Sequence, residues 1–117
     1  MKIRVDPLDR LFSKYVRLKA GEKCERCGHY TPFGNLQVSH YHGRAKRSTR
    51  YDEENVTASC FACHMYFHAH PLEHTEFMIR RLGQQGFDML TARANTPARY
   101  VDINAITLYL REKLSGD

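Results

Sequence analysis

The sequence predicts an α+β fold in which a short pair of strands is held by a metal site and flanked by helices. Two Cys-x-x-Cys pairs, Cys24 with Cys27 and Cys60 with Cys63, enclose two short runs of strand-like residues. Apolar residues at helical spacing come before and after this segment. The 117 residues have room for one domain with a modest core.

The first predicted element is an amphipathic helix over residues 7–20. Asp6 and Pro7 are typical of a helix N-cap followed by proline in the first turn. Apolar residues then recur at helical spacing, at Leu8, Leu11, Phe12, Tyr15 and Val16. Three basic residues, Arg10, Lys14 and Arg17, fall on the outer face, where they are either solvated or in contact with phosphate.

The four cysteines predict one structural zinc site. Each Cys-x-x-Cys pair supplies two thiolates from a tight turn, and four thiolates complete a tetrahedral zinc site with no open position for catalysis. The start of the chain lacks the apolar core of a secretory signal, so we expect a cytoplasmic protein with reduced cysteines. Buried free thiols and disulfides are the alternatives.

Two short strands are expected next, over residues 36–41 and 55–59, joined by a basic loop. The loop carries Arg44, Lys46, Arg47 and Arg50, and we expect these residues to bind DNA backbone phosphates. Arg50 could instead pair with Asp52, Glu53 or Glu54. The net charge of +5 also favours an anionic partner.

Helices are predicted for the rest of the chain. Residues 61–70 form one helix, which ends before Pro71, and residues 71–114 form a helical extension with an apolar stripe that is either core or a dimer face. We therefore expect one domain over residues 1–117, made of helix 7–20, a zinc-clamped core at 24–70 and this extension. The protein would be a monomer or homodimer without a membrane span.

Histidines are concentrated around the second cysteine pair. His64 and His68 are four residues apart, so both rings lie on one helix face and can share a divalent cation. His40, in the first strand, could lie opposite them. His42 could contact phosphate or metal, whereas we expect His29, His70 and His74 to be surface or core residues.

This pattern resembles the HNH (ββα-metal) endonucleases with a four-cysteine zinc clamp. The matching residues are Val38-Ser39-His40, Asn55-Val56 and Cys60-x-x-Cys63-His64. The amino-terminal helix, the Cys-x-x-Cys-Gly knuckle and the stretch from Thr49 to Asn55 are also similar to phage NinG-type recombination proteins. The motifs cover residues 24–68, with a weaker likeness over 7–23.

The resemblance implies a ββα-metal (His-Me finger) unit and a metal-dependent DNA endonuclease or nickase that hydrolyses phosphodiester bonds. His40 would be the general base that activates water, His64 would hold the catalytic divalent ion, and Asn55 would hold the loop between the strands. Alternatively, Asn55 is an ordinary turn residue. The resemblance also implies a phage or prophage protein that acts in the bacterial cytosol.

One position departs from the family pattern. Members place Asp or His before the general base as a metal ligand, and here that residue is Ser39. We expect His68, water or His42 to complete the metal site. Because imidazole suits Mn²⁺, Ni²⁺ or Zn²⁺ better than Mg²⁺, activity with Mn²⁺ should at least equal that with Mg²⁺.

Two other functions fit the same composition. A non-catalytic zinc-ribbon-like module would bind nucleic acid through the basic loop without using His40 and His64. A RING-type or LIM-type interaction domain is less favoured, because no cysteines remain for a second structural zinc site.

Overall fold

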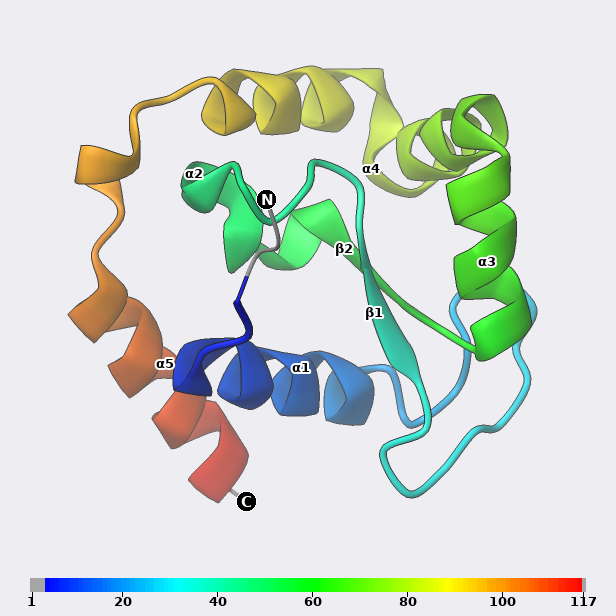
Figure 1. Cartoon of the computed structure of the whole chain (residues 1–117), viewed down its shortest axis with the longest axis horizontal. Coiled ribbons are helices and arrows are strands. Elements are labelled where there is room, and N and C mark those ends of the chain that lie inside the picture. The colour runs from blue at the N-terminus through cyan, green and yellow to red at the C-terminus, as the bar shows by residue number, and fades with distance from the viewer. Residues whose placement is uncertain (1–3, 117) are drawn as a thin grey trace.

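A computed structural model describes residues 4–116 and has the predicted α+β fold, with five α-helices and one two-stranded sheet in this part of the chain. The elements are α1 (Pro7–Lys19), β1 (Gln37–His40), α2 (Arg47–Arg50), the 3₁₀ turn η1 (Glu53–Asn55), β2 (Val56–Ser59), α3 (Phe61–Ala69), α4 (Pro71–Ala94), the 3₁₀ turn η2 (Ala98–Tyr100) and α5 (Ile103–Ser115). The helices surround the sheet, with α1 and α3 beside β1 and with α4 on the side away from α1 (Figure 1).

Helix α1 begins at a complete capping box. The Asp6 side chain accepts a hydrogen bond from the backbone N–H of Asp9, and the Asp9 side chain accepts one from the N–H of Asp6. Pro7 fits the first turn because that turn has no partner for its N–H. The helix ends at Lys19, before Gly21, which has a φ of 67°.

The two strands pair antiparallel, with Gln37 opposite Ser59 and His40 opposite Val56. All four residues of β2 are buried, because α1 and α3 both pack against this strand. Between the strands the chain forms α2 and η1, so the predicted loop is partly helical.

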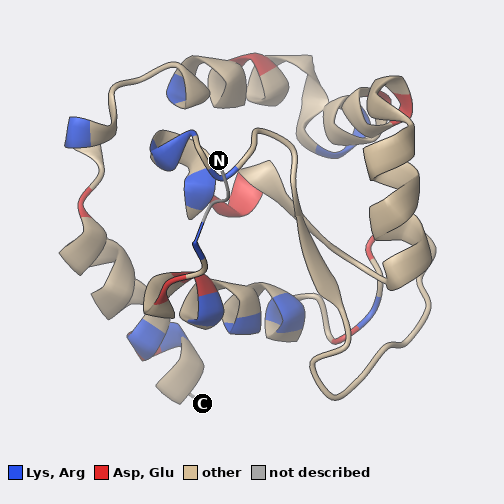
Figure 2. Cartoon of the chain, viewed as in Figure 1, with Lys and Arg blue, Asp and Glu red and all other residues tan. Residues whose placement is uncertain are grey.

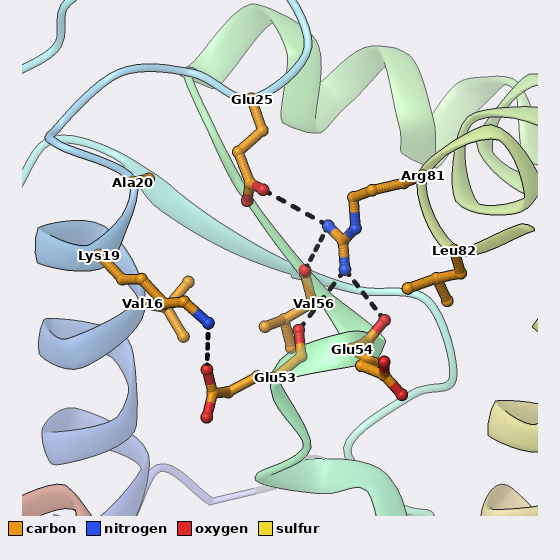
Figure 3. Close-up of a pocket in the computed structure, with 9 residues that line it drawn as sticks. All are labelled: Val16, Lys19, Ala20, Glu25, Glu53, Glu54, Val56, Arg81 and Leu82. Carbon is orange, nitrogen blue, oxygen red and sulfur yellow. Dashed lines mark hydrogen bonds and ion pairs between the residues drawn. The ribbon is translucent and has the colours of Figure 1, made fainter. Parts of the chain in front are cut away.

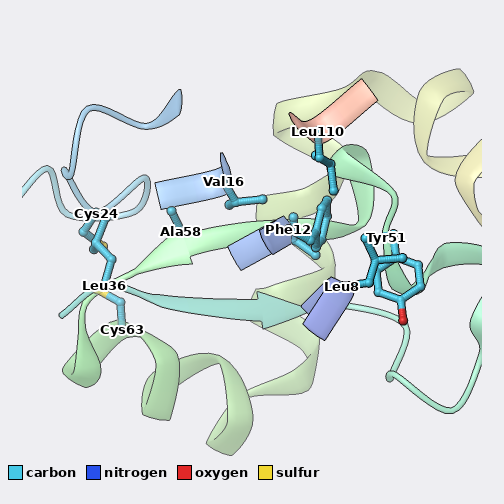
Figure 4. Close-up of a cluster of buried hydrophobic side chains, with 10 residues drawn as sticks. Leu8, Phe12, Val16, Cys24, Leu36, Tyr51, Ala58, Cys63 and Leu110 are labelled. Atoms are coloured by element: carbon cyan, nitrogen blue, oxygen red, sulfur yellow. The ribbon is translucent and has the colours of Figure 1, made fainter. Parts of the chain in front are cut away.

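The hydrophobic core lies between α1, the sheet and α5. Val16 of α1 lies beside Ala58 of β2, Phe12 lies beside Leu110 of α5, and Leu8 lies beside Tyr51 (Figure 4). The apolar stripe of the carboxy-terminal helix is therefore part of the core.

Helix α4 contacts the sheet through Arg81. Its guanidinium donates hydrogen bonds to the carbonyl oxygens of Val56 (2.8 Å) and Glu54 (3.0 Å), and it forms an ion pair with Glu25 at 3.6 Å (Figure 3). Gly83, two residues later, has a φ of 77° and marks a kink in α4. Arg81 therefore fixes the first half of α4 against the start of β2. Across the described residues, no helix has the length and apolar character needed to cross a membrane.

A buried ion pair joins α1 to α2. The Arg50 side chain is 6% exposed, and its guanidinium donates to both carboxylate oxygens of Asp9, with an Nε–Oδ1 distance of 3.0 Å. Burial raises the pKa of Asp9, but hydrogen bonds from Arg50 and the Asp6 backbone and the charge of Arg50 outweigh it, so the pKa lies below the ordinary 3.8. This stabilisation is present above pH 3.8 and is lost as the pH falls through the lower folded value.

We expect Asp9→Asn to lower the free energy of unfolding by about 3 kcal/mol, because it leaves the buried Arg50 guanidinium with only the half-exposed Asp6 carboxylate, 3.8 Å away, as a counter-charge. Asparagine keeps an oxygen for the capping box. The control is Lys19→Met, which removes the more exposed ion pair between Lys19 and Glu53 and should cost about 0–1 kcal/mol. Denaturant titration measures both, and equal losses would contradict the importance of the buried pair.

Candidate functional site: a four-cysteine cluster and a hollow lined by histidines

The four cysteines converge on one point. One sulfur from each of Cys24, Cys27, Cys60 and Cys63 lies within 4.8 Å of all the others, as a tetrahedral metal site requires. The N–H of Cys27 points to the sulfur of Cys24 at 3.5 Å, and Gly28 turns the chain with a φ of 80°. The zinc-binding prediction is supported by a cluster of four sulfurs that could hold a structural zinc ion.

The surroundings of the sulfurs differ. Burial raises the pKa of Cys24, but backbone N–H groups donate to its sulfur and lower the pKa to about 6. Burial raises the pKa of Cys63 to about 12, although Arg26 donates to its sulfur at 3.3 Å. A bound cation would favour the thiolate form of Cys63. Arg26 also stacks 3.8 Å from the ring centre of Tyr66, so its charge is fixed beside the cluster.

Two hollows meet at His40 and His64, and His64 follows Cys63 of the cluster in the chain. The histidine hollow, about 420 Å³, is lined by five histidines, His40, His42, His64, His68 and His74. The α1 hollow, about 450 Å³, lies between α1 and β1 and is lined by Ser13, Gln37, Arg44, His40 and His64 among others. Only His40 and His64 are common to both linings, so these two predicted site residues face the same space.

The hydrogen bonds of His40 fix which ring nitrogen carries the proton. Its Nε2 lies 2.9 Å from the carbonyl oxygen of Arg50. A carbonyl oxygen can only accept, so Nε2 carries the hydrogen and Nδ1 of the neutral ring keeps its lone pair. Burial lowers the pKa of His40 more than the Arg50 carbonyl raises it, which favours this neutral ring.

His64 has the opposite arrangement. Its Nδ1 lies 2.6 Å from Ser39 Oγ, which lies 2.7 Å from Ser59 Oγ, and Ser59 Oγ donates to the carbonyl oxygen of Gln37 at 3.5 Å. When Ser59 Oγ donates to the carbonyl oxygen of Gln37, Ser39 Oγ donates to Ser59 and His64 donates from Nδ1 to Ser39. Nε2 of His64 therefore keeps its lone pair. Burial is the main cause of the lowered pKa of His64, and the charge of His68 lowers it further.

Asn55 holds the segment between the strands. Its side chain is fully buried, its Nδ2 donates to the carbonyl oxygens of His42 (2.9 Å) and Thr49 (3.0 Å), and its Oδ1 accepts from the N–H of His42 (2.8 Å). The residue after Thr49 is Arg50, whose carbonyl accepts from His40. The amide of Asn55 thus fixes the backbone that fixes the His40 ring.

The other histidines occupy different parts of the histidine hollow. His68 is exposed one turn after His64, and β1 ends at His40, so His42 lies in the following turn. Among residues 4–116, only the cysteine cluster brings possible metal-ligand atoms from three or more His, Cys, Asp or Glu side chains within 4.8 Å of one another. In the described chain, His64 and His68 are therefore not part of a group of three such ligand atoms.

The sequence left open whether His74 is a surface or a core residue, and it gave no role to Ser59. His74 is 8% exposed, stacks on Phe67 at 4.2 Å, and has a buried Nε2 without a hydrogen-bond partner in the described chain, as does His42. Burial lowers the pKa of His74 to about 4. Alternation in the second strand puts Ser59 on the face of Thr57, but only the pairing register shows that this face also carries Ser39.

The basic loop residues divide into two groups. Lys46 and Arg47 are exposed, and Lys46 donates to Asn95 at 3.2 Å. Arg44 lines the α1 hollow, 3.9 Å from Asp9. The predicted phosphate contact of Arg50 is corrected, because its guanidinium is buried against Asp9 rather than against the suggested Asp52, Glu53 or Glu54.

Removal of zinc from the full chain is expected to unfold the segment between the cysteine pairs, because binding of the ion is coupled to folding. Circular dichroism and metal analysis before and after complete chelation measure this change. Cys60→Ser should reduce the bound zinc, and His29→Ala, an exposed neighbour of the first pair, should not. An unchanged spectrum after complete chelation would contradict a structural role.

Comparison with known proteins agrees with these observations. Residues 3–115, nearly the whole chain, match the model of the family described as NinG, Bacteriophage Lambda NinG protein. No curated protein and no solved structure matches the chain. With both Cys-x-x-Cys pairs and the histidine-lined hollows inside the matched range, the chain belongs to the NinG family.

Proposed function

We propose that this NinG-family chain is a metal-dependent DNA endonuclease or nickase, with β1, β2 and α3 forming a ββα-metal unit of the HNH type. The observation that supports the proposal most strongly is that His40 and His64 lie at the same place in the fold. Both line the same two hollows, and their hydrogen bonds leave unlike nitrogens with a lone pair, Nδ1 in His40 and Nε2 in His64.

His40 is the proposed general base. Its Nδ1 would take a proton from the water that attacks the phosphodiester, and the proton would remain on the ring as a positive charge. The carbonyl oxygen of Arg50 favours that charged ring and holds it in one orientation. Asn55 has a positioning role, because it holds the backbone next to Arg50.

His64 is the proposed ligand of a divalent ion, with His68 beside it on the same helix face. When bound, the ion would neutralise charge that develops on the phosphate oxygens and the leaving oxygen. Ser39 takes the place of the usual ligand and instead accepts the Nδ1 hydrogen of His64. Such a bond to the far nitrogen is typical of histidines that ligate metals, so the donor set fits an ion.

DNA is the proposed substrate because of the charges beside the site. Arg44 lines the α1 hollow, and Lys46 and Arg47 follow it on the exposed surface. Such residues bind backbone phosphates and position DNA without reading its sequence.

A second candidate function is a non-catalytic zinc module that binds nucleic acid. The four-cysteine cluster favours it, because that cluster is complete without any other residue and needs no catalytic ion. This candidate assigns no role to the hydrogen bonds of His40 and His64, and it is distinguished by activity.

Supercoiled plasmid incubated with Mn²⁺ is expected to be nicked or linearised by the wild type and at least about 100-fold more slowly by His40→Ala, because the general base is lost. His64→Ala should also abolish cleavage while keeping its structural zinc. His29→Ala is the control, since His29 is exposed and does not line either hollow. Equal cutting by wild type and His40→Ala would exclude the general base, and no cutting by the wild type with Mn²⁺ or Mg²⁺ would favour the second candidate.

Titration of the cleavage rate with metal is expected to give at least as much activity with Mn²⁺ as with Mg²⁺, because imidazole nitrogen is a poor ligand for Mg²⁺. Ser39→Ala removes the partner of His64 Nδ1 and should raise the Mn²⁺ concentration at half-maximal rate about tenfold or more. The matched control is Ser48→Ala, whose hydroxyl donates to Ala94 outside the site. A clear preference for Mg²⁺, or an unchanged Mn²⁺ requirement in Ser39→Ala, would contradict the ligand assignment.

A further inference from the structure

Helix α1 carries a row of basic residues that the proposed catalytic chemistry does not use. The α1 row consists of Arg10, Lys14 and Arg17, spaced four and three residues apart, so the three side chains lie on one face. The rise of about 1.5 Å per residue puts Arg10 and Arg17 about 10 Å apart along the axis. Figure 2 shows the Lys and Arg positions along this helix, whereas α3 on the other side of β1 has none.

The α1 row borders the hollow that contains His40 and His64. Asp9 and Ser13 of α1 line that hollow. At about 100° of rotation per residue, Arg17 lies about 40° and Arg10 about 60° around the helix from Ser13, on the side away from buried Phe12. Arg17 extends past the end of the hollow, where its guanidinium lies against Gly34. The row therefore follows the solvent edge of the hollow.

The charges of the α1 row are not neutralised within the described part of the chain. No salt bridge joins Arg10, Lys14 or Arg17 to an acidic residue from position 4 to 116. Lys19, on the last turn of the same helix, pairs with Glu53. Arg81 pairs with Glu25, and Arg93 pairs with Asp52 and Glu54. Other basic residues, such as Arg80, Arg99 and Arg111, also lack an ion pair in the described chain, but the α1 row is the group that lies beside the hollow.

We propose that the α1 row binds the phosphate backbone of duplex DNA along one edge of the hollow, while the loop residues from Arg44 to Arg47 bind it beyond His40. This inference rests on the proposed function for its choice of DNA. A row of evenly spaced charges on a rigid helix fits the repeating phosphates of a backbone. The row supplies position and affinity, and it reads no base sequence.

The test is the salt dependence of DNA binding by the full-length, zinc-loaded chain. All proteins carry His40→Ala, so that the duplex is not cut, and no divalent ion is added. Fluorescence anisotropy with a labelled duplex is measured over a range of salt concentrations. The test variant carries Arg10→Gln, Lys14→Gln and Arg17→Gln. The control carries Arg99→Gln, Arg111→Gln and Lys113→Gln, which remove the same charge from exposed positions of η2 and α5. Circular dichroism checks that both variants are folded.

Each phosphate contact contributes about 0.9 to the slope of log K against log salt concentration. We expect the slope of the test variant to be about 2.7 less negative than that of the parent, and the control to keep the parental slope. Equal slopes for test variant and control would overturn the proposal, as would absence of binding by the parent or binding to RNA or acidic protein alone. Cleavage assays with His40 intact separate the two proposals. If the salt slope depends on the α1 row but no DNA is cleaved, the nuclease proposal is refuted and DNA binding by the α1 row stands. If DNA is cleaved but the slope does not depend on the α1 row, DNA binding by the row is refuted and the nuclease proposal stands.

Discussion

Arg50 connects the framework of the protein to its candidate site. Its guanidinium is buried on the Asp9 carboxylate of α1, and its carbonyl oxygen holds Nε2 of His40. One residue therefore joins the first helix, the segment between the strands and the proposed base. Asn55 adds to this constraint from the other end of the segment, because its amide binds the backbone of His42 and Thr49. The orientation of the His40 ring thus depends on a buried charge pair and a buried amide.

The cysteine cluster provides the second constraint, which acts on His64. Cys63 lies one residue before His64 in the first turn of α3, and Cys60 is its N-cap residue. A zinc ion on the four sulfurs would fix the start of α3 against the knuckle of Cys24 and Cys27. The helix then presents His64 to Ser39, whose hydroxyl accepts from Nδ1. The two constraints meet at β1, where Ser39 contacts His64 and the next residue in the chain is His40.

Local features of the fold were predictable from the sequence, and contacts between distant residues were not. Periodicity, the Asp6-Pro7 cap and the cysteine spacing predicted α1, both strands and the four-sulfur cluster, because each signal is contained in a few neighbouring residues. Arg50 was assigned to DNA because its charge is visible in the sequence and its partner Asp9, 41 residues earlier, is not. The register that brings Ser39 to Ser59 and the fold of α4 that buries His74 likewise depend on tertiary packing.

The central claim is that His40 and His64 carry their protons on unlike nitrogens, so that one ring can act as a base and the other as a ligand. Two-bond ¹H–¹⁵N NMR correlation spectra of the zinc-loaded chain at neutral pH test it directly, with His40→Ala and His64→Ala to assign the signals. The expected spectra show His40 protonated at Nε2 and His64 protonated at Nδ1. The same tautomer in both rings, or the reverse pair, would contradict the account.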